Sequence, residues 1–188
     1  MFEVNVEQGI RLREIQMTAA QAIFQIIDRD REYMRVWLPF VNFTRIVEDT
    51  ETFIKNAHAE PADRKETIYV IMHKNQLAGL ISFKYTDRTN HKTELGYWLA
   101  QDQQGKGLVT KSCKALINLA FERMGMHRVQ IRVSVDNHRS KSIPKRLGFK
   151  FEGIERDGEF LNGHYTDLEV YSILKNEWLH HNGNTKAL

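Results

Sequence analysis

Gln104-Gly105-Lys106-Gly107-Leu108-Val109-Thr110 decides the fold, because this stretch joins a segment typical of a strand to a segment typical of a helix. The preceding residues, Thr93 to Leu99, have the aliphatic and aromatic content of a strand. Apolar residues then recur at helical spacing, at Val109, Cys113, Leu116, Ile117, Ala120 and Met124. Two nearby glycines allow a tight turn, and the start of the helix adds free N–H groups and the positive end of its dipole. The stretch therefore predicts a phosphate-binding turn.

Two common phosphate-binding motifs do not fit this turn. A dinucleotide fingerprint needs Gly or Ala three residues after Gly107, where Thr110 stands. A P-loop closes a longer loop with Gly-Lys followed by Ser or Thr. At this point a plain strand-to-helix turn without a ligand remains the alternative.

Composition indicates a soluble globular protein. The 188 residues are most simply one domain, residues 1–188, with a polar, flexible tail expected from about residue 180. The net charge of +3 is small and no basic block is dense enough to indicate a nucleic-acid partner. The single cysteine, Cys113, excludes an internal disulfide, and no apolar run is long enough to span a membrane. We therefore expect a cytoplasmic protein with no membrane partner.

Hydrophobic periodicity divides the chain into strands and helices. Strands are expected near residues 10–15, 67–72, 77–83, 93–99 and 128–135, with a final hairpin over 150–174. Helices are expected near residues 18–27, 33–38, 46–58 and 109–124, the second of them ended by Pro39, and a short helix to about residue 147 is expected after the turn and cap residues 136–140. The three central strands should form an antiparallel meander, and the strand–helix–strand unit around the glycine turn implies one parallel pair. Asn162-Gly163 predicts the tip of the hairpin.

The glycine stretch resembles the pyrophosphate loop of the GCN5-related N-acetyltransferases (the GNAT superfamily), whose pattern is Gln/Arg-x-x-Gly-x-Gly/Ala. Val109 departs from that pattern, since Gly or Ala is usual at its position. Asn137-x-x-Ser140, followed by Gly148-Phe149, resembles the segment with which the family holds the pantetheine arm. The order of expected elements is also similar to that of the family. The resemblance implies an α/β fold with a mostly antiparallel sheet, a parallel strand pair around an acetyl-CoA site, and flanking helices.

Further segments resemble the RimJ/RimL branch, the N-terminal acetyltransferases of ribosomal proteins. They are Trp37-Leu38-Pro39, Gly96-Tyr97-Trp98-Leu99, Val135-Asp136-Asn137 and Leu161-Asn162-Gly163-His164-Tyr165-x-Asp167. This resemblance implies transfer of acetyl from acetyl-CoA directly to an amine, with the N-terminal α-amino group of a ribosomal protein as acceptor and a homodimer as the assembly. Acetylation of a small amine, such as an antibiotic or a polyamine, and a non-catalytic acyl-CoA-binding module are the alternatives.

The resemblance also implies which residues contact the coenzyme. Backbone amides from Gln104 to Thr110 would hold the pyrophosphate, and a backbone N–H near Leu99 would polarise the thioester. Lys106 would add charge there, unless it is a solvated loop lysine. The residues expected at the coenzyme are Trp98, Leu99, Gln104, Gly105, Lys106, Gly107, Leu108, Val109, Thr110 and Asn137.

Two residues are candidates for moving protons. Glu159, just before the hairpin tip, matches the position of the base in RimL-like enzymes; otherwise it is a hairpin carboxylate opposite Thr166. Many members of the family place a tyrosine acid seven residues after the Asn, where this chain has Pro144. Ser140 matches the position given this role in RimL-like enzymes, so the resemblance implies that it protonates the leaving thiolate, unless it serves only to start the helix. Pro144 should also keep that helix short or bent, because it gives no N–H to the Ser140 carbonyl.

Three aromatic residues are candidates for contacting the acceptor amine, namely Trp37, Tyr97 and Tyr165. The aromatics around Trp37 could equally cap the core. Cys113 lies on the apolar stripe of its helix and is predicted to be a core residue and not a nucleophile. The histidines have no spacing that indicates a metal site, so we predict no metal.

Overall fold

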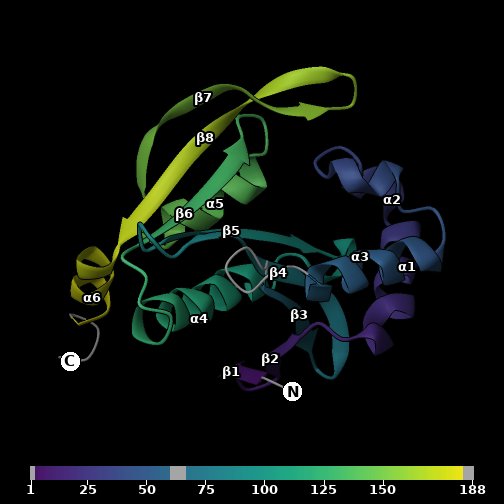
Figure 1. Cartoon of the computed structure of the whole chain (residues 1–188), viewed down its shortest axis with the longest axis horizontal. Coiled ribbons are helices and arrows are strands. Elements are labelled where there is room, and N and C mark those ends of the chain that lie inside the picture. Colours follow the sequence, from purple (N-terminus) through teal and green to yellow (C-terminus); the bar gives the residue numbers. More distant parts are fainter. Residues whose placement is uncertain (1–2, 60–66, 184–188) are drawn as a thin grey trace.

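The structure is a computed structural model that describes residues 3–59 and 67–183. Within these residues one sheet has the strand order β1-β2-β3-β4-β5-β6-β8-β7 (Figure 1). The strands are β1 (Glu3–Glu7), β2 (Ile10–Glu14), β3 (Thr67–His73), β4 (Gln76–Asp87), β5 (Lys92–Leu99), β6 (Arg128–Ser134), β7 (Lys150–Leu161) and β8 (His164–Leu174). The α-helices are α1 (Ala20–Arg29), α2 (Arg31–Met34), α3 (Val47–Ala59), α4 (Leu108–Glu122), α5 (His138–Arg146) and α6 (Lys175–Gly183). Short 3-10 helices are η1 (Met17–Ala19), η2 (Pro39–Asn42) and η3 (Gln101–Gln103).

The sheet is mixed, as the sequence predicts. β5 and β6 pair in parallel across the α4 crossover, and every other neighbouring pair is antiparallel. The parallel pairing runs only from Lys92 with Arg128 to Glu94 with Gln130, although β5 continues to Leu99. The two strands therefore diverge, and β6, β7 and β8 rise away from β5 as a separate arm (Figure 1).

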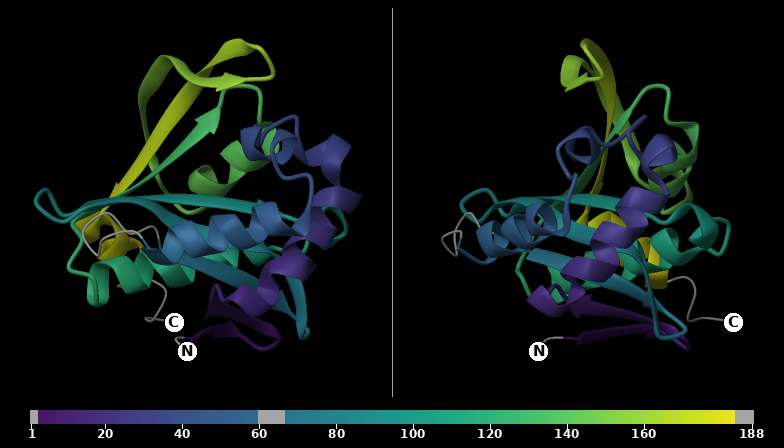
Figure 2. Two further views of the ribbon diagram at one scale, coloured as in Figure 1. Left: turned by 45° about the vertical axis from the view of Figure 1, so that its right-hand side comes forward. Right: turned by 90° about the vertical axis from the view of Figure 1, so that its right-hand side faces the viewer.

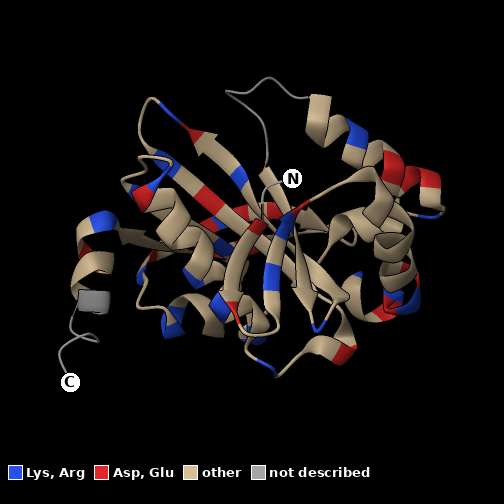
Figure 3. Cartoon of the chain, turned by 90° about the horizontal axis from the view of Figure 1, so that it is seen from below, with Lys and Arg blue, Asp and Glu red and all other residues tan. Residues whose placement is uncertain are grey.

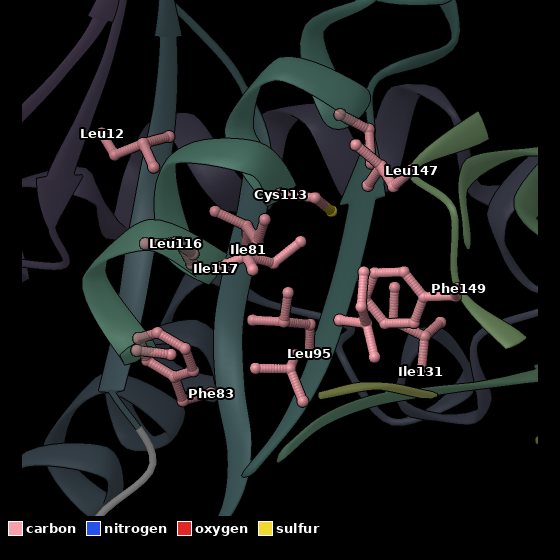
Figure 4. Packing of buried hydrophobic residues seen from close by; sticks show 14 of the residues in the cluster. Leu12, Ile81, Phe83, Leu95, Cys113, Leu116, Ile117, Ile131, Leu147 and Phe149 are labelled. Carbon is pink, nitrogen blue, oxygen red and sulfur yellow. The ribbon is translucent and has the colours of Figure 1, made fainter. Parts of the chain in front are cut away.

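Helices cover both faces of the sheet (Figure 2). On one face α4 buries an apolar stripe against the central strands, and Cys113, Leu116 and Ile117 are fully buried there (Figure 4). On the other face α1 and α3 pack over β3 and β4, and Ile23 and Ile54 belong to that second cluster. The prediction that Cys113 is a core residue is confirmed. Burial also raises the pKa of its thiol, which keeps it protonated.

The hairpin of β7 and β8 turns at Asn162-Gly163, as predicted. Both residues have positive φ, 51° and 85°, which is the conformation that favours Asn-Gly in a two-residue turn. The Asn162 side-chain amide donates to the Arg35 carbonyl at 3.1 Å. The hairpin tip thus reaches the end of α2, far from it in the sequence.

Several elements differ from the predictions. The sequence did not predict strand β1, which pairs with β2, or helix α6. Helix α2 ends at Met34, and Pro39 begins η2 instead of ending the second helix. Because α6 continues to Gly183, the first part of the predicted flexible tail is helical; the rest of that tail lies outside the described residues.

Charged residues are mixed over the surface. Seen from below, Lys and Arg positions are interspersed with Asp and Glu positions over strands and helices (Figure 3). This matches the small net charge of +3. In the parts of the chain that the structure describes, no helix has both the length and the apolarity needed to cross a membrane.

Candidate active site

The glycine turn presents a row of backbone amides. Gly105 and Gly107 both have positive φ, 73° and 72°, and Gly107 is the residue immediately before α4. Such angles are strained for residues with a Cβ, so the two glycines make the turn possible. From Gly105 to Thr110 no backbone amide donates to another described residue. Together with the positive end of the α4 dipole, these free donors can hold an anionic group.

A cavity of about 800 Å³ lies beside this turn. Its wall comes from the segment after α1, the end of β5, the turn with the first residues of α4, and helix α5. The lining residues are Tyr33, Met34, Trp37, Leu38, Tyr97, Trp98, Leu99, Gln104, Gly105, Gly107, Leu108, Val109, Thr110, Asn137, Arg139, Ser140, Ser142, Ile143 and Arg146. The wall is therefore apolar along β5 and polar along the turn and α5, which suits a ligand with an uncharged arm and an anionic end.

Two arginines of α5 face the glycine turn, and neither was predicted as a site residue. Arg146 donates to the Thr110 hydroxyl and to the Ser142 hydroxyl, each at 2.7 Å. Arg139 donates to the Gln104 side-chain oxygen at 2.5 Å. Neither guanidinium pairs with a carboxylate of another described residue, so their positive charge is not neutralised within the protein. Their spacing of seven residues, which places both on one helical face, was the available sequence signal.

The Gln104 side chain connects two walls of the cavity. Its side-chain nitrogen donates to the Tyr33 hydroxyl, and its oxygen accepts from Arg139. The Gln104 amide group thus links the helix α2 region to α5 across the start of the turn.

The structure brings together most of the residues predicted for the site. The predicted residues that line the cavity are Trp37, Tyr97, Trp98, Leu99, Gln104, Gly105, Gly107, Leu108, Val109, Thr110, Asn137 and Ser140. Lys106 lies outside the wall; its ammonium group donates to the Asp102 carbonyl and the Gln103 side chain, each at 2.9 Å. Tyr165 is also outside, 63% exposed on β8 with its ring against Phe160.

Helix α5 begins at the cavity, and Asn137 is its N-cap. The Asn137 side-chain oxygen accepts from the Ser140 backbone N–H at 3.0 Å, which satisfies one free donor of the first turn. The Ser140 hydroxyl lies 3.3 Å from the Tyr97 hydroxyl. Pro144 lies inside the helix, which is only nine residues long, as the sequence predicts.

Glu159 lies near charged residues on the face of the sheet opposite α4. The charged groups that act on it are Lys84, Glu94 and Arg132. Successive side chains of a strand point to opposite faces of the sheet, and the apolar neighbours of Glu94 and Arg132 belong to the core on the α4 face. The Lys84 side chain lies over Gly96, which also points away from α4. All three charged side chains therefore lie on the face opposite α4. On β7 Glu159 stands opposite Thr166, and its carboxylate forms no hydrogen bond or ion pair with another described residue. Partial burial raises the pKa of Glu159, and this effect outweighs the attraction of Lys84 and Arg132.

The two other carboxylates near Arg132, those of Glu94 and Glu155, are already hydrogen-bonded. Glu94, only 3% exposed, accepts from the side chains of Gln130 at 2.9 Å and Arg132 at 2.8 Å. Arg132 also donates to Glu155 at 3.1 Å. Glu159 is therefore the carboxylate of this group that is available to take a proton.

The residues at the cavity fit a coenzyme that carries a diphosphate. Free amides, two unneutralised arginines and a helix N-terminus converge at one end, and the Trp98, Leu99 and Ile143 side of the wall can take an apolar arm. Beyond Glu94 the backbone of β5 has no strand partner on its β6 side. Among the described residues no group of three or more His, Cys, Asp or Glu is placed to hold a metal ion.

Comparison with known proteins gives one family. Residues 10–150 match the model of the acetyltransferase (GNAT) domain. YdaF of Bacillus subtilis strain 168, provisionally named a ribosomal N-acetyltransferase, is 35% identical over 95% of this chain and 98% of its own. The ribosomal-protein-serine acetyltransferase of Escherichia coli K12 is 27% identical over 90% and 94%. The spermidine N(1)-acetyltransferase of the same strain is 24% identical over 91% and 89%.

Solved structures agree with these relatives. A RimL ribosomal L7/L12 alpha-N-protein acetyltransferase in complex with coenzyme A superimposes with a TM-score of 0.87 at 25% identity, over 92% of this chain and 98% of that chain. The microcin C7 self-immunity acetyltransferase MccE, in complex with acetyl-CoA and AMP, gives 0.87 at 29% identity, over 91% and 95%. The predicted resemblance and fold class are both confirmed.

Proposed function

Since this chain belongs to the acetyltransferase (GNAT) family and acts as an N-acetyltransferase that uses acetyl-CoA, we propose that its acceptor is the N-terminal α-amino group of a protein. The observation that carries this proposal is Glu159, a half-buried carboxylate with a raised pKa and no bonded partner among the described residues. A ribosomal protein is the acceptor class that the names of the relatives support.

Acetyl-CoA supplies an activated acetyl thioester. The amides from Gly105 to Thr110 would hold its diphosphate, together with the guanidinium groups of Arg139 and Arg146. To reach the diphosphate, Arg139 would exchange its bond to Gln104, and Arg146 its bond to Thr110, for bonds to phosphate oxygens. The apolar wall from Trp98, Leu99 and Ile143, beside the point where β5 and β6 diverge, would hold the pantetheine arm. A thioester held there would have Ser140 on one side and Glu159 on the other.

Glu159 takes the proton of the attacking amine. The amine nitrogen forms a bond to the acetyl carbon, the carbon–sulfur bond breaks, and its electron pair stays on sulfur. Glu159 accepts one nitrogen proton directly or through a water, and Ser140 gives its hydroxyl proton to sulfur. Water restores the Ser140 proton and removes the one on Glu159, so the enzyme returns to its starting state.

An α-amino group suits a single carboxylate base. Its pKa is roughly 7.7 to 8.0, against about 10.4 for a lysine side chain, so an appreciable fraction is already unprotonated near neutral pH. A polyamine carries further ammonium groups that need carboxylates of their own. Glu94 and Glu155 are both bonded to Arg132, and Lys84 lies nearby, so this face offers little free negative charge. These contacts favour a monoamine over spermidine, which is the substrate named for some relatives.

A panel of acceptors tests the proposal. Release of free thiol from acetyl-CoA is followed with peptides that begin with Ser or Ala, the same peptides with a blocked N-terminus and an internal lysine, spermidine, and an aminoglycoside. We expect release with the free N-terminal peptides alone. Turnover of spermidine in preference to peptides would move the acceptor to the small amines, and binding of the coenzyme without turnover would indicate an acyl-CoA-binding module. Homodimer formation and cytoplasmic location stay predictions; light scattering measures the first and fractionation the second.

A further inference from the structure

The hydroxyl of Tyr97 meets Ser140 at the cavity wall. Tyr97 extends from β5 and Ser140 from α5, and both line the cavity. The Tyr97 hydroxyl donates to the Ser140 backbone carbonyl at 3.3 Å, and the Ser140 hydroxyl donates to the Tyr97 hydroxyl at the same distance. One phenol therefore contacts both the backbone carbonyl and the hydroxyl of a single residue.

Pro144 explains why the carbonyl of Ser140 is open to Tyr97. In a regular α-helix that carbonyl accepts from the backbone N–H four residues later. Residue 144 is a proline inside α5 and has no N–H to give. The phenol from β5 takes the place of the missing donor, so the feature that removes a helical bond also fixes the tyrosine.

The position of the phenol allows two hydrogen-bond arrangements. Its oxygen is equally distant from the Ser140 carbonyl and the Ser140 Oγ, so a rotation about the phenolic C–O bond moves its proton from one to the other. When the phenol donates to Oγ, the Ser140 hydroxyl no longer donates to Tyr97, and its hydrogen can point into the cavity. An Oγ that accepts such a bond is also a better donor itself.

The ring of Tyr97 holds the phenol in place. It packs against the α4 core cluster, and burial raises the pKa of Tyr97, so the phenol stays protonated and able to donate. The structure therefore contains a fixed O–H donor directly beside the Ser140 hydroxyl.

We propose that Tyr97 is a positioning residue, which donates to Ser140 Oγ during acetyl transfer and directs the Ser140 hydroxyl at the departing sulfur. This inference rests on the proposed function, because it assigns a role to Ser140 in the same reaction. When the carbon–sulfur bond breaks, its electron pair stays on sulfur and the Ser140 proton moves to it. The Tyr97 hydroxyl stabilises the negative charge that develops on Oγ until water returns a proton.

Kinetics of four variants test the role of Tyr97 with the best acceptor of the panel. Tyr97→Phe keeps the ring and should lower kcat about 10-fold, with KM for acetyl-CoA changed by less than about 2-fold. Ser140→Ala should lower kcat about 100-fold, and the double variant should be no slower than Ser140→Ala, because Tyr97 acts through Ser140. Tyr85→Phe, a matched change at a 63% exposed tyrosine of β4, should keep the wild-type rate.

A second readout does not depend on turnover. The pKa of the thiol of bound coenzyme A is measured by thiolate absorbance, with thermal unfolding to verify that each variant is folded. Both Tyr97→Phe and Ser140→Ala should raise this pKa, because the sulfur loses a hydrogen-bond donor. A Tyr97→Phe variant with wild-type kcat and an unchanged thiol pKa overturns the inference, as does a double variant that is slower by the product of the single losses. If the wild type releases no thiol with any acceptor, the proposed function fails, while the thiol titration still decides the role of Tyr97.

Discussion

Replacing Glu159 by Gln removes the proposed base with little change of shape. Glu159 has no bonded partner among the described residues, so the substitution breaks no ion pair. The raised pKa of Glu159 also determines whether the substitution raises or lowers the free energy of unfolding. A carboxyl with a raised pKa in the folded state contributes stability below its unfolded pKa and loses it as pH rises through the folded value. At neutral pH the ionised Glu159 thus opposes folding, and the Gln variant should be at least as stable as the wild type.

The rate should fall by about 100-fold. A positioned general base contributes roughly 10²- to 10⁴-fold, and we expect the lower end, because an α-amino group is partly unprotonated without help. The pH profile should change as well. Below the pKa of Glu159 the wild type must lose protons from both the base and the amine, so log(kcat/KM) should rise with a slope of two. The Gln variant should rise with a slope of one and level off above the pKa of the amine, roughly 7.7 to 8.0.

The assay is release of thiol from acetyl-CoA with an N-terminal peptide between pH 5 and 9. Glu152→Gln is the matched control, because Glu152 lies on the same strand but is bonded to Arg128 and Ser172. The control should keep the wild-type rate and slope. A Glu159→Gln variant with more than half of the wild-type kcat/KM, or with a slope of two at low pH, would refute the assignment of the base.

Three further predictions follow from the contacts described. Arg146→Gln should raise the Kd for coenzyme A about 10-fold in calorimetry, and less at 1 M salt, because a charge-assisted bond to phosphate is lost; an equal Kd would contradict the clamp by α5. Glu152→Gln should lower the urea midpoint at pH 7. The Arg128 guanidinium lowers the pKa of Glu152 to about 2, so its stabilisation is present above about 4.5 and lost as pH falls toward 2, where variant and wild type should converge. Gly79→Ala should destabilise the protein by about 1–3 kcal/mol in urea denaturation, because a Cβ there would lie 2.2 Å from the Trp98 carbonyl. The same clash should weaken coenzyme binding. Wild-type values for both would show that β4 and β5 can separate freely.

Local patterns predicted most of the fold. The Asn162-Gly163 turn and the glycines before α4 were readable because their backbone angles demand those residues. Strand β1 was not, since Glu3–Glu7 has only two apolar residues and is never fully buried. Helix α6 lacks an apolar stripe, and Trp178 is the side chain that anchors it. Both elements depend on neighbours that sequence periodicity does not reveal.

The site was predictable where one segment supplies it. The amides from Gly105 to Thr110 follow from the turn itself, and Asn137 follows from its place before a helix. Arg139 and Arg146 depend on how α5 packs beside α4, which is a tertiary relation. The contact of Tyr97 with Ser140 joins residues 43 positions apart and depends on a carbonyl left open by a proline, so no local pattern indicates it.

Both proposals depend on the amides of the glycine turn binding the diphosphate of coenzyme A. A crystal structure of the protein with coenzyme A measures this directly. Diphosphate oxygens should lie about 2.7–3.2 Å from backbone nitrogens between Gly105 and Thr110, with the sulfur beside Ser140. A diphosphate bound elsewhere, with those amides facing only solvent, would contradict it.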